Sequence, residues 1–205
     1  DGSTDTTEQV VSTFQKKAPF EIRYYKQENS GKHIAINKGV RLAKGDYFMI
    51  LDSDDYIPKN GLEILFTKIN NRNTSKIGGV VGRKLYENLK LIGSKLEKEV
   101  ISDSLSIRIK YKLEGDLAEV FRTEVLKKFP FPQFEHEKFC PEALVWNRIA
   151  QEYKLLFFCQ GIYIAEYLEN GLTNRITEIR MQSSKASMLY YSELATYNIS
   201  TIQKM

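Results

Sequence analysis

Three aspartates, Asp52, Asp54 and Asp55, follow directly on a short apolar run in the sequence LDSDD. The run itself, residues 47–50 (YFMI), is typical of a buried β-strand. Charged side chains at the carboxyl end of such a strand lie where open α/β sheets bind ligands. Three negative charges within four positions repel one another unless a cation joins them. Because carboxylate oxygens suit Mg²⁺ or Mn²⁺, the cluster predicts a divalent metal that holds a nucleotide diphosphate.

Length and composition predict a single globular domain. The chain has 205 residues, of which 42% are hydrophobic and 27% charged, with a net charge of +4. Its basic residues form no long run and no recognised motif, so we expect no nucleic-acid partner. No apolar run reaches the roughly 18 residues of a membrane span, and Cys140 and Cys159 are interpreted as free thiols in a reducing compartment. We therefore expect a cytoplasmic protein and leave open an association with the inner face of the plasma membrane.

Helical and strand patterns alternate along the first part of the chain. Apolar spacing and β-rich runs predict helices over residues 6–17, 32–43 and 58–70, and strands over residues 21–26, 47–51 and 77–82. In the first helix, Val10, Val11 and Phe14 are expected on the inner face. This alternation favours a mostly parallel sheet with helices on its faces. Residues 86–100 are expected to form a hairpin or a segment that leaves the sheet rather than part of the core.

The second half of the chain is less regular. The patterns there predict strands over residues 118–122, 155–158 and 162–167, and helices over residues 123–129, 142–153 and 184–197. Trp146 is expected in the core, with stacking against a bound acceptor as the alternative. We find no internal repeat, low-complexity tract or domain linker.

Several segments, taken together, resemble family 2 glycosyltransferases of the GT-A fold. They are residues 1–5 (DGSTD), residues 29–46 (with NSGK, NKG and GD) and residues 51–55 (LDSDD). Residues 137–142 (EKFCPE) are similar to the segment where that family places its catalytic base, at the start of a helix. The motifs fall in the family's order, and the resemblance covers most of the chain. It implies an α/β, three-layer sandwich around a mostly parallel sheet, in a single domain over residues 1–205.

The resemblance also implies a function. Residues 1–100 would form the nucleotide-sugar-binding half, and residues 101–205 the acceptor half with a C-terminal lid and helix, the lid beginning at Gly171. The activity would be that of an inverting, metal-dependent hexosyl- or N-acetylhexosaminyl-transferase in polysaccharide biosynthesis. The donor would be a nucleotide-sugar, with a UDP-sugar favoured, and the acceptor a hydroxyl of a saccharide or lipid-linked saccharide. Donor sugar, acceptor, linkage and oligomeric state stay open.

By resemblance, the acidic cluster and the first loops bind the donor. Asp54 would ligate Mn²⁺ or Mg²⁺ directly, while Asp52 would contact the ribose or a metal-bound water. Asp55 would orient the site or touch the sugar, and Asp1 would face the nucleotide base. Lys32, at a helix N-terminus, would meet a phosphate or the base, with a plain surface lysine as the alternative.

Two further acids complete the predicted site. Asp116, just before a strand, would bind the donor sugar or serve only in a turn. Glu142 would act as the general base that takes the proton of the acceptor hydroxyl. Glu137 is the alternative base, and a favourable acid in the first turn of a helix is the alternative interpretation of Glu142.

Two departures from the family's pattern matter. Members carry an apolar strand and a helix before the DGSTD segment, and this sequence begins without them. Strands missing from the N-terminus would lie between residues 22–25 and 48–51, so we expect the native protein to be longer there. Members commonly have Glu-Asp where this chain has Glu142-Ala143. These departures favour a non-catalytic nucleotide- or glycan-binding module as the first alternative function, and a nucleotidyltransferase is the second.

Overall fold

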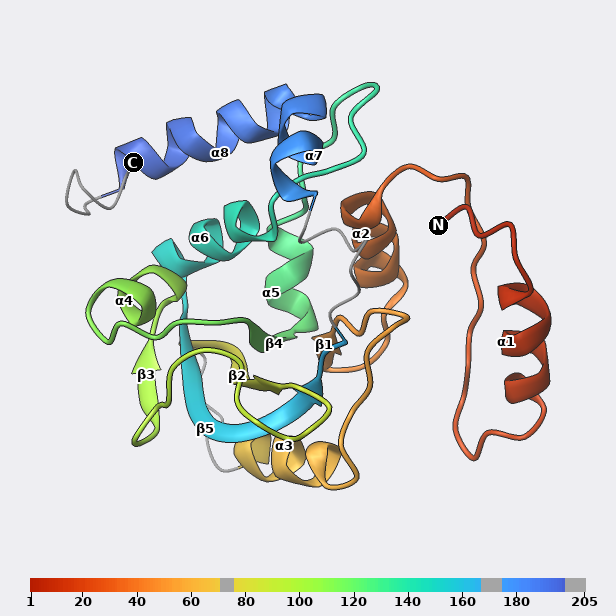
Figure 1. The fold of residues 1–205 in the computed structure, drawn as a ribbon, viewed down its shortest axis with the longest axis horizontal. Coiled ribbons are helices and arrows are strands. Elements are labelled where there is room, and N and C mark those ends of the chain that lie inside the picture. Colours follow the sequence, from red (N-terminus) through yellow and green to blue (C-terminus); the bar gives the residue numbers. More distant parts are fainter. Residues whose placement is uncertain (71–75, 167–174, 198–205) are drawn as a thin grey trace.

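The computed structural model describes residues 1–70, 76–166 and 175–197, and its centre is a five-stranded sheet (Figure 1). In chain order the strands are β1 (Tyr47–Met49), β2 (Ile77–Leu85), β3 (Val100–Ser102), β4 (Leu117–Arg122) and β5 (Lys154–Ile164). The order across the sheet is β1-β4-β2-β5-β3. Strands β2 and β5 pair in parallel, while β4 is antiparallel to β1 and β2, and β3 is antiparallel to β5. Thus β1, β2 and β5 run in one direction, and β3 and β4 run in the other.

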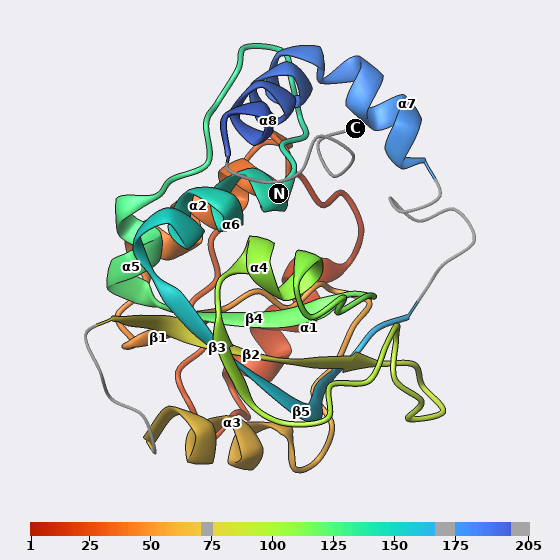
Figure 2. The same ribbon diagram turned by 90° about the vertical axis from the view of Figure 1, so that its left-hand side faces the viewer.

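Helices cover both faces of the sheet and give three layers (Figure 2). On one face lie α2 (Lys32–Leu42), α4 (Ser104–Ile109), α5 (Thr123–Lys128) and α6 (Glu142–Glu152), with α7 (Ile176–Gln182) and α8 (Ser184–Thr196) beyond them; on the other lies α3 (Gly61–Asn70). The larger hydrophobic cluster joins the first set to the sheet through residues such as Val40, Phe121 and Ile149. A second cluster joins α3 to the sheet around Leu65 and Phe158. The predicted α/β sandwich is confirmed, but the sheet is mixed rather than mostly parallel, because among the described strands only β2 and β5 pair in parallel.

Most predicted helices form within a few residues of the expected bounds. These are α2, α3, α5, α6 and α8. The two β-like runs predicted at residues 155–158 and 162–167 form one strand, β5, whose pairing with β2 shifts register on either side of Arg83 and Gly161. Helix α7 and the pair β3–α4 were not predicted. The start of the predicted lid, at Gly171, lies outside the described residues.

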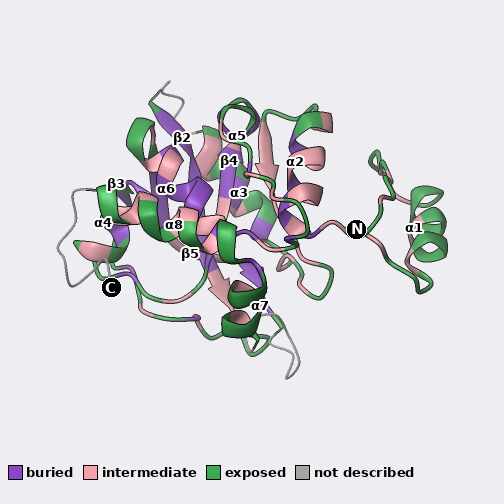
Figure 3. Ribbon diagram, turned by 90° about the horizontal axis from the view of Figure 1, so that it is seen from above, coloured by how far each residue is buried: buried purple, intermediate pink, exposed green. Residues whose placement is uncertain are grey.

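The N-terminal segment differs most from the prediction. Helix α1 (Thr7–Gln15) forms as expected but stands beside the main body (Figures 1 and 3) and buries none of its residues. Its expected inner face is therefore exposed, with Val10 49% and Phe14 61% accessible. The strand predicted at residues 21–26 is not formed. A strand needs a neighbouring strand for its backbone hydrogen bonds, and among the described residues β1 pairs only with β4.

Candidate active site

Lys32 links two of the predicted site acids, although the three residues lie far apart in sequence. Its Nζ is 2.8 Å from Oδ1 of Asp52 and 3.0 Å from Oε1 of Glu142. Lys32 is the first residue of α2, Asp52 follows β1, and Glu142 is the first residue of α6. The fold therefore brings a helix N-terminus, a strand end and a second helix N-terminus to one point.

The two carboxylates keep Lys32 charged. Burial of the ammonium group disfavours its charged form, but the attraction of Glu142 and Asp52 outweighs burial and holds the pKa of Lys32 above its ordinary value. All three side chains remain partly open to solvent, between 35% and 40% exposed. A cation held between two acids at the edge of a cleft is well placed to exchange one of them for a phosphate oxygen.

The loop before Lys32 is fixed by Asp1. The Asp1 carboxylate accepts hydrogen bonds from the backbone N–H groups of Ser30 (3.0 Å) and Gly31 (2.9 Å) and from the side-chain amide of Gln27 (2.8 Å). Gly31 adopts φ +97°, and a Cβ there would lie 2.1 Å from the carbonyl oxygen of Lys138. Only glycine fits this position, so Asp1 and Gly31 together aim the start of α2. The predicted contact of Asp1 with a nucleotide base stays a proposal.

The acidic loop is anchored to the end of β5. The backbone N–H of Asp52 donates to the hydroxyl of Tyr163 (3.1 Å), and the carboxylate of Asp55 accepts from the backbone N–H of Glu166 (2.9 Å). Tyr163 is 1% exposed, and burial raises the pKa of its hydroxyl far above the ordinary value. Lys84 lies over the ring, with Nζ 4.1 Å from the centroid. Neither Tyr163 nor Lys84 was predicted, although Tyr163 falls where β5 ends.

Asp54 suits a metal ion that is shared with a substrate. Its side chain is exposed and makes no hydrogen bond or ion pair to another described residue. Within residues 1–70, 76–166 and 175–197, no three His, Cys, Asp or Glu side chains converge into a complete metal cage. Mg²⁺ is ordinarily held by one or two carboxylates together with phosphate oxygens and waters. The residues present fit that mode of binding, with Asp54 as the proposed protein ligand.

Glu137, the alternative base, has another role in the structure. Its two carboxylate oxygens accept the backbone N–H groups of Lys185 (2.8 Å) and Ala186 (2.9 Å) in the first turn of α8. The residue is only 8% exposed. A carboxylate in this position satisfies helix-terminal donors and opposes the positive end of the helix dipole. We therefore retain Glu142 as the proposed base.

We expect Glu137→Gln to lower the stability of the protein and leave its activity nearly unchanged. Loss of a charged acceptor at a helix N-terminus should lower the free energy of unfolding by about 1–2 kcal/mol, which is a fall in Tm of roughly 2–8 °C for a chain of this size. Urea titration and thermal melts measure the effect, and Glu135→Gln, at an 84% exposed side chain in the same loop, is the matched control. A normal Tm together with a large loss of turnover would instead make Glu137 the base.

A cleft of about 830 Å³ collects four of the predicted residues: Asp1, Lys32, Asp116 and Glu142. Asp52 joins them through its ion pair with Lys32. Arg175, which precedes α7, and Arg180, in the last turn of that helix, line the same cleft. Candidates from both halves of the chain therefore meet in one place, but Asp54 and Asp55 are not among the residues that line this cleft.

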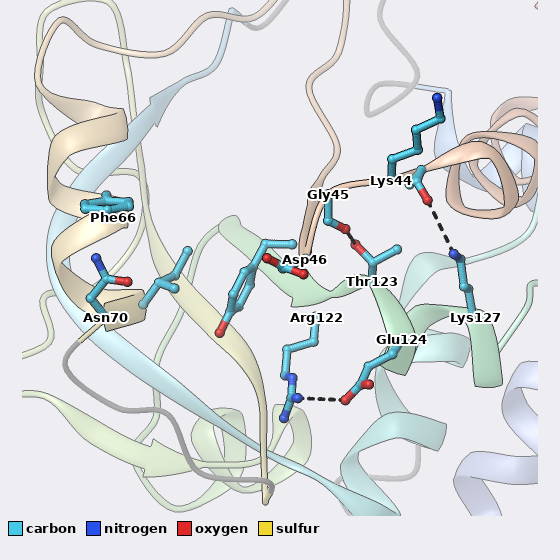
Figure 4. A pocket seen from close by; sticks show the side chains of 12 residues that line it. Lys44, Gly45, Asp46, Phe66, Asn70, Arg122, Thr123, Glu124 and Lys127 are labelled. Carbon is cyan, nitrogen blue, oxygen red and sulfur yellow. Dashed lines mark hydrogen bonds and ion pairs between the residues drawn. The ribbon is translucent and has the colours of Figure 1, made fainter.

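A second pocket, of about 750 Å³, lies at the opposite end of β1 (Figure 4). Its polar groups largely bond one another: the Thr123 hydroxyl donates to the carbonyl of Gly45 (2.6 Å), and Arg122 pairs with Glu124 (2.8 Å). None of the predicted site residues lines it. The cleft at Lys32 is therefore the candidate active site.

Comparison with known proteins identifies the family. The family model described as "Glycosyl transferase family 2" matches residues 1–125. The chain belongs to this family.

In the part of the protein that the structure describes, no helix is long and apolar enough to span a membrane, and Cys140 and Cys159 are both unpaired.

Similar proteins share parts of the chain. An uncharacterized glycosyltransferase of Mycoplasma pneumoniae (the MG060 homolog) is 42% identical over 67 residues, which is 32% of this chain and 22% of that protein. The cholesterol galactosyltransferase of Borreliella burgdorferi is 23% identical over 211 residues, covering 100% of this chain and 58% of its own length. The poly-beta-1,6-N-acetyl-D-glucosamine synthase of Staphylococcus aureus is 31% identical over 97 residues, or 47% of this chain and 23% of the synthase. This chain thus spans less than two thirds of each relative.

The fold matches crystal structures of residues 1–349 of S. aureus TarS. The complexes with UDP and with UDP-GlcNAc both superpose with a TM-score of 0.67 at 20% identity, covering 100% of this chain and 57% and 58% of TarS 1–349, respectively. The likeness confirms the predicted GT-A fold.

Proposed function

We propose that this domain transfers a sugar from a nucleotide-sugar, with a UDP-sugar favoured, to a hydroxyl of a saccharide or lipid-linked saccharide. The observation that carries the proposal is that Lys32, which lines the cleft, pairs with both Asp52 and Glu142. This arrangement places the ammonium group of Lys32, which can pair with the diphosphate, beside the carboxylate of Glu142, which can accept a proton. Family membership supports the transferase class, and the complexes of TarS with UDP and UDP-GlcNAc support the donor class.

In the proposed reaction Glu142 accepts the proton of the acceptor hydroxyl. The hydroxyl oxygen forms a bond to the anomeric carbon as the bond from that carbon to the diphosphate oxygen breaks, so the configuration inverts and UDP leaves. Lys32 pairs with the diphosphate, whose negative charge increases as it departs. A Mn²⁺ or Mg²⁺ ion held by Asp54 would supply further positive charge to the leaving diphosphate. Arg175 and Arg180 lie where they can close the cleft over the donor.

The test is a panel of nucleotide-sugars, including UDP-glucose, UDP-galactose, UDP-GlcNAc and GDP-mannose, each with Mn²⁺. We expect at least one UDP-sugar to raise the Tm, because a ligand that binds only the folded state stabilises it, and to release UDP in a metal-dependent manner. Binding without turnover would favour the non-catalytic module. Release of pyrophosphate from UTP and a sugar phosphate would favour the nucleotidyltransferase.

A further inference from the structure

A cavity of about 310 Å³ lies beneath the proposed base, between α4, α6 and α8. Its walls are mainly apolar and include Ile107, Leu117, Trp146 and Phe157, with Tyr190 from α8. Besides Ser104, three larger polar side chains also line it: Arg108 from α4, Glu119 from β4 and Asn147 from α6. None of these three was a candidate from the sequence.

Glu119 is the unusual member of this group. It stands opposite Val81 in the sheet, between the buried residues Ala118 and Val120. Its carboxyl group makes no hydrogen bond or ion pair with another described residue. Burial, and next the negative charge of Glu142, raise the pKa of Glu119 to about 7, against the attraction of Arg108 and Lys84. A carboxyl group in such surroundings is costly unless a partner donates a hydrogen bond to it.

The other two polar groups also have unused bonding capacity. Asn147 is 6% exposed, and its side-chain amide makes no hydrogen bond to another described residue; its backbone carbonyl also accepts from the side-chain amide of Gln151 at 3.3 Å. Arg108 donates through Nη1 to the carbonyls of Leu113 (2.8 Å) and Gly115 (2.7 Å), which leaves Nε and Nη2 without a partner among the described residues. The cavity thus offers an acid, an amide and a guanidinium group within apolar and aromatic walls.

The cavity adjoins the active-site cleft at the first turn of α6. Ala143 lines both this cavity and the active-site cleft, and Glu142 precedes it in the first turn of the helix. Glu142 pairs with Lys32, which in turn pairs with Asp52, and both of these residues are donor-binding candidates. None of those candidates lines the cavity. A molecule held in the cavity would reach Glu142 along the next turn of α6, away from the donor-binding residues.

We propose that this cavity binds a sugar ring of the acceptor, with Glu119 and Asn147 as the residues that select it by hydrogen bonds to its hydroxyl groups. Sugar hydroxyls both donate and accept hydrogen bonds, which matches an acid beside an amide. The apolar and aromatic walls suit the faces of a pyranose ring, and the volume lies at the lower end of the range for small-ligand sites. An apolar ligand would leave Glu119 and Asn147 buried without partners. The assignment rests on the proposed function, since it concerns the acceptor of that reaction.

The test measures binding to the full chain of methyl β-glycosides of glucose, galactose, GlcNAc and GalNAc, by saturation-transfer NMR and calorimetry. We expect at least one to bind with a millimolar Kd, and Glu119→Gln and Asn147→Ser to weaken it at least fivefold. Binding of UDP with Mn²⁺ should change by less than twofold. Glu97→Gln, at a 79% exposed side chain, is the control. If one variant does not fold, as judged by circular dichroism, the other carries the test.

The proposal is overturned if no glycoside binds, or if the variants bind glycosides as the wild type does. It is also overturned if the variants lose affinity for the UDP-sugar but not for UDP, because the cavity would then hold the donor's sugar. Failure of the proposed function has a different signature, in which the wild-type chain neither binds UDP with Mn²⁺ nor releases UDP from any donor.

Discussion

Replacing Asp54 with alanine is expected to lower the release of UDP about a thousandfold at saturating donor and Mn²⁺. A metal ion beside a departing diphosphate contributes several kcal/mol, and each 1.36 kcal/mol is a tenfold change in rate. The exposed Asp54 carboxylate makes no bond to another described residue, so its loss removes no contact of the fold. The melting temperature without ligand should therefore stay within about 1 °C of the wild type.

The control is Asp46→Ala, at the other end of β1. Asp46 is also exposed, lines the pocket of Figure 4 and engages the structure through its backbone carbonyl, which accepts from the N–H of Thr123 at 2.8 Å. Calorimetric titration of Mn²⁺ in the presence of UDP should show weakened binding in Asp54→Ala and normal binding in Asp46→Ala. If Asp54→Ala retains both metal binding and turnover, the metal has other ligands or the reaction does not need it.

The sequence predicted the elements whose formation depends on neighbouring residues in the chain. Helices α2, α3, α5, α6 and α8 follow from apolar spacing, and the acidic loop after β1 follows from a sharp change in polarity. The prediction of a strand at residues 21–26 was wrong because a strand forms only against a partner strand, and that partner can be distant in sequence. For the same reason, a correct helix, α1, was assigned a buried face that it does not have.

The site could be predicted only as a set of residues. Family motifs identified Lys32, Asp52 and Glu142, but nothing in the sequence joins positions 32 and 142, and their ion pair results from the packing of α2 and α6 over one end of the sheet. Glu119 was missed for the opposite reason. It sits in a run of strand residues where an outward-facing acid is ordinary, and only the fold shows that it lines a cavity.

Glu142→Gln is the second large expected effect, a loss of 10²- to 10⁴-fold in kcat for transfer. Glutamine keeps the size of the side chain and can still accept a hydrogen bond from Lys32, but it cannot take the proton of the acceptor hydroxyl. Donor binding should survive, so the increase in Tm with UDP and Mn²⁺ should match the wild type.

A carboxylate that only favoured the helix dipole would behave differently. Its loss would lower stability by about 0.3–1 kcal/mol and leave turnover close to normal. Glu152→Gln, at the other end of α6, controls for changes in helix charge. A double-mutant cycle with Lys32→Met separates the two roles further, because the ion pair at 3.0 Å contributes to both single variants. If Glu142 acts as the base, Glu142→Gln should lower kcat in the Lys32→Met variant nearly as much as it does in the wild type. If Glu142 acts only by holding Lys32, Glu142→Gln should cause no further loss of kcat in the Lys32→Met variant.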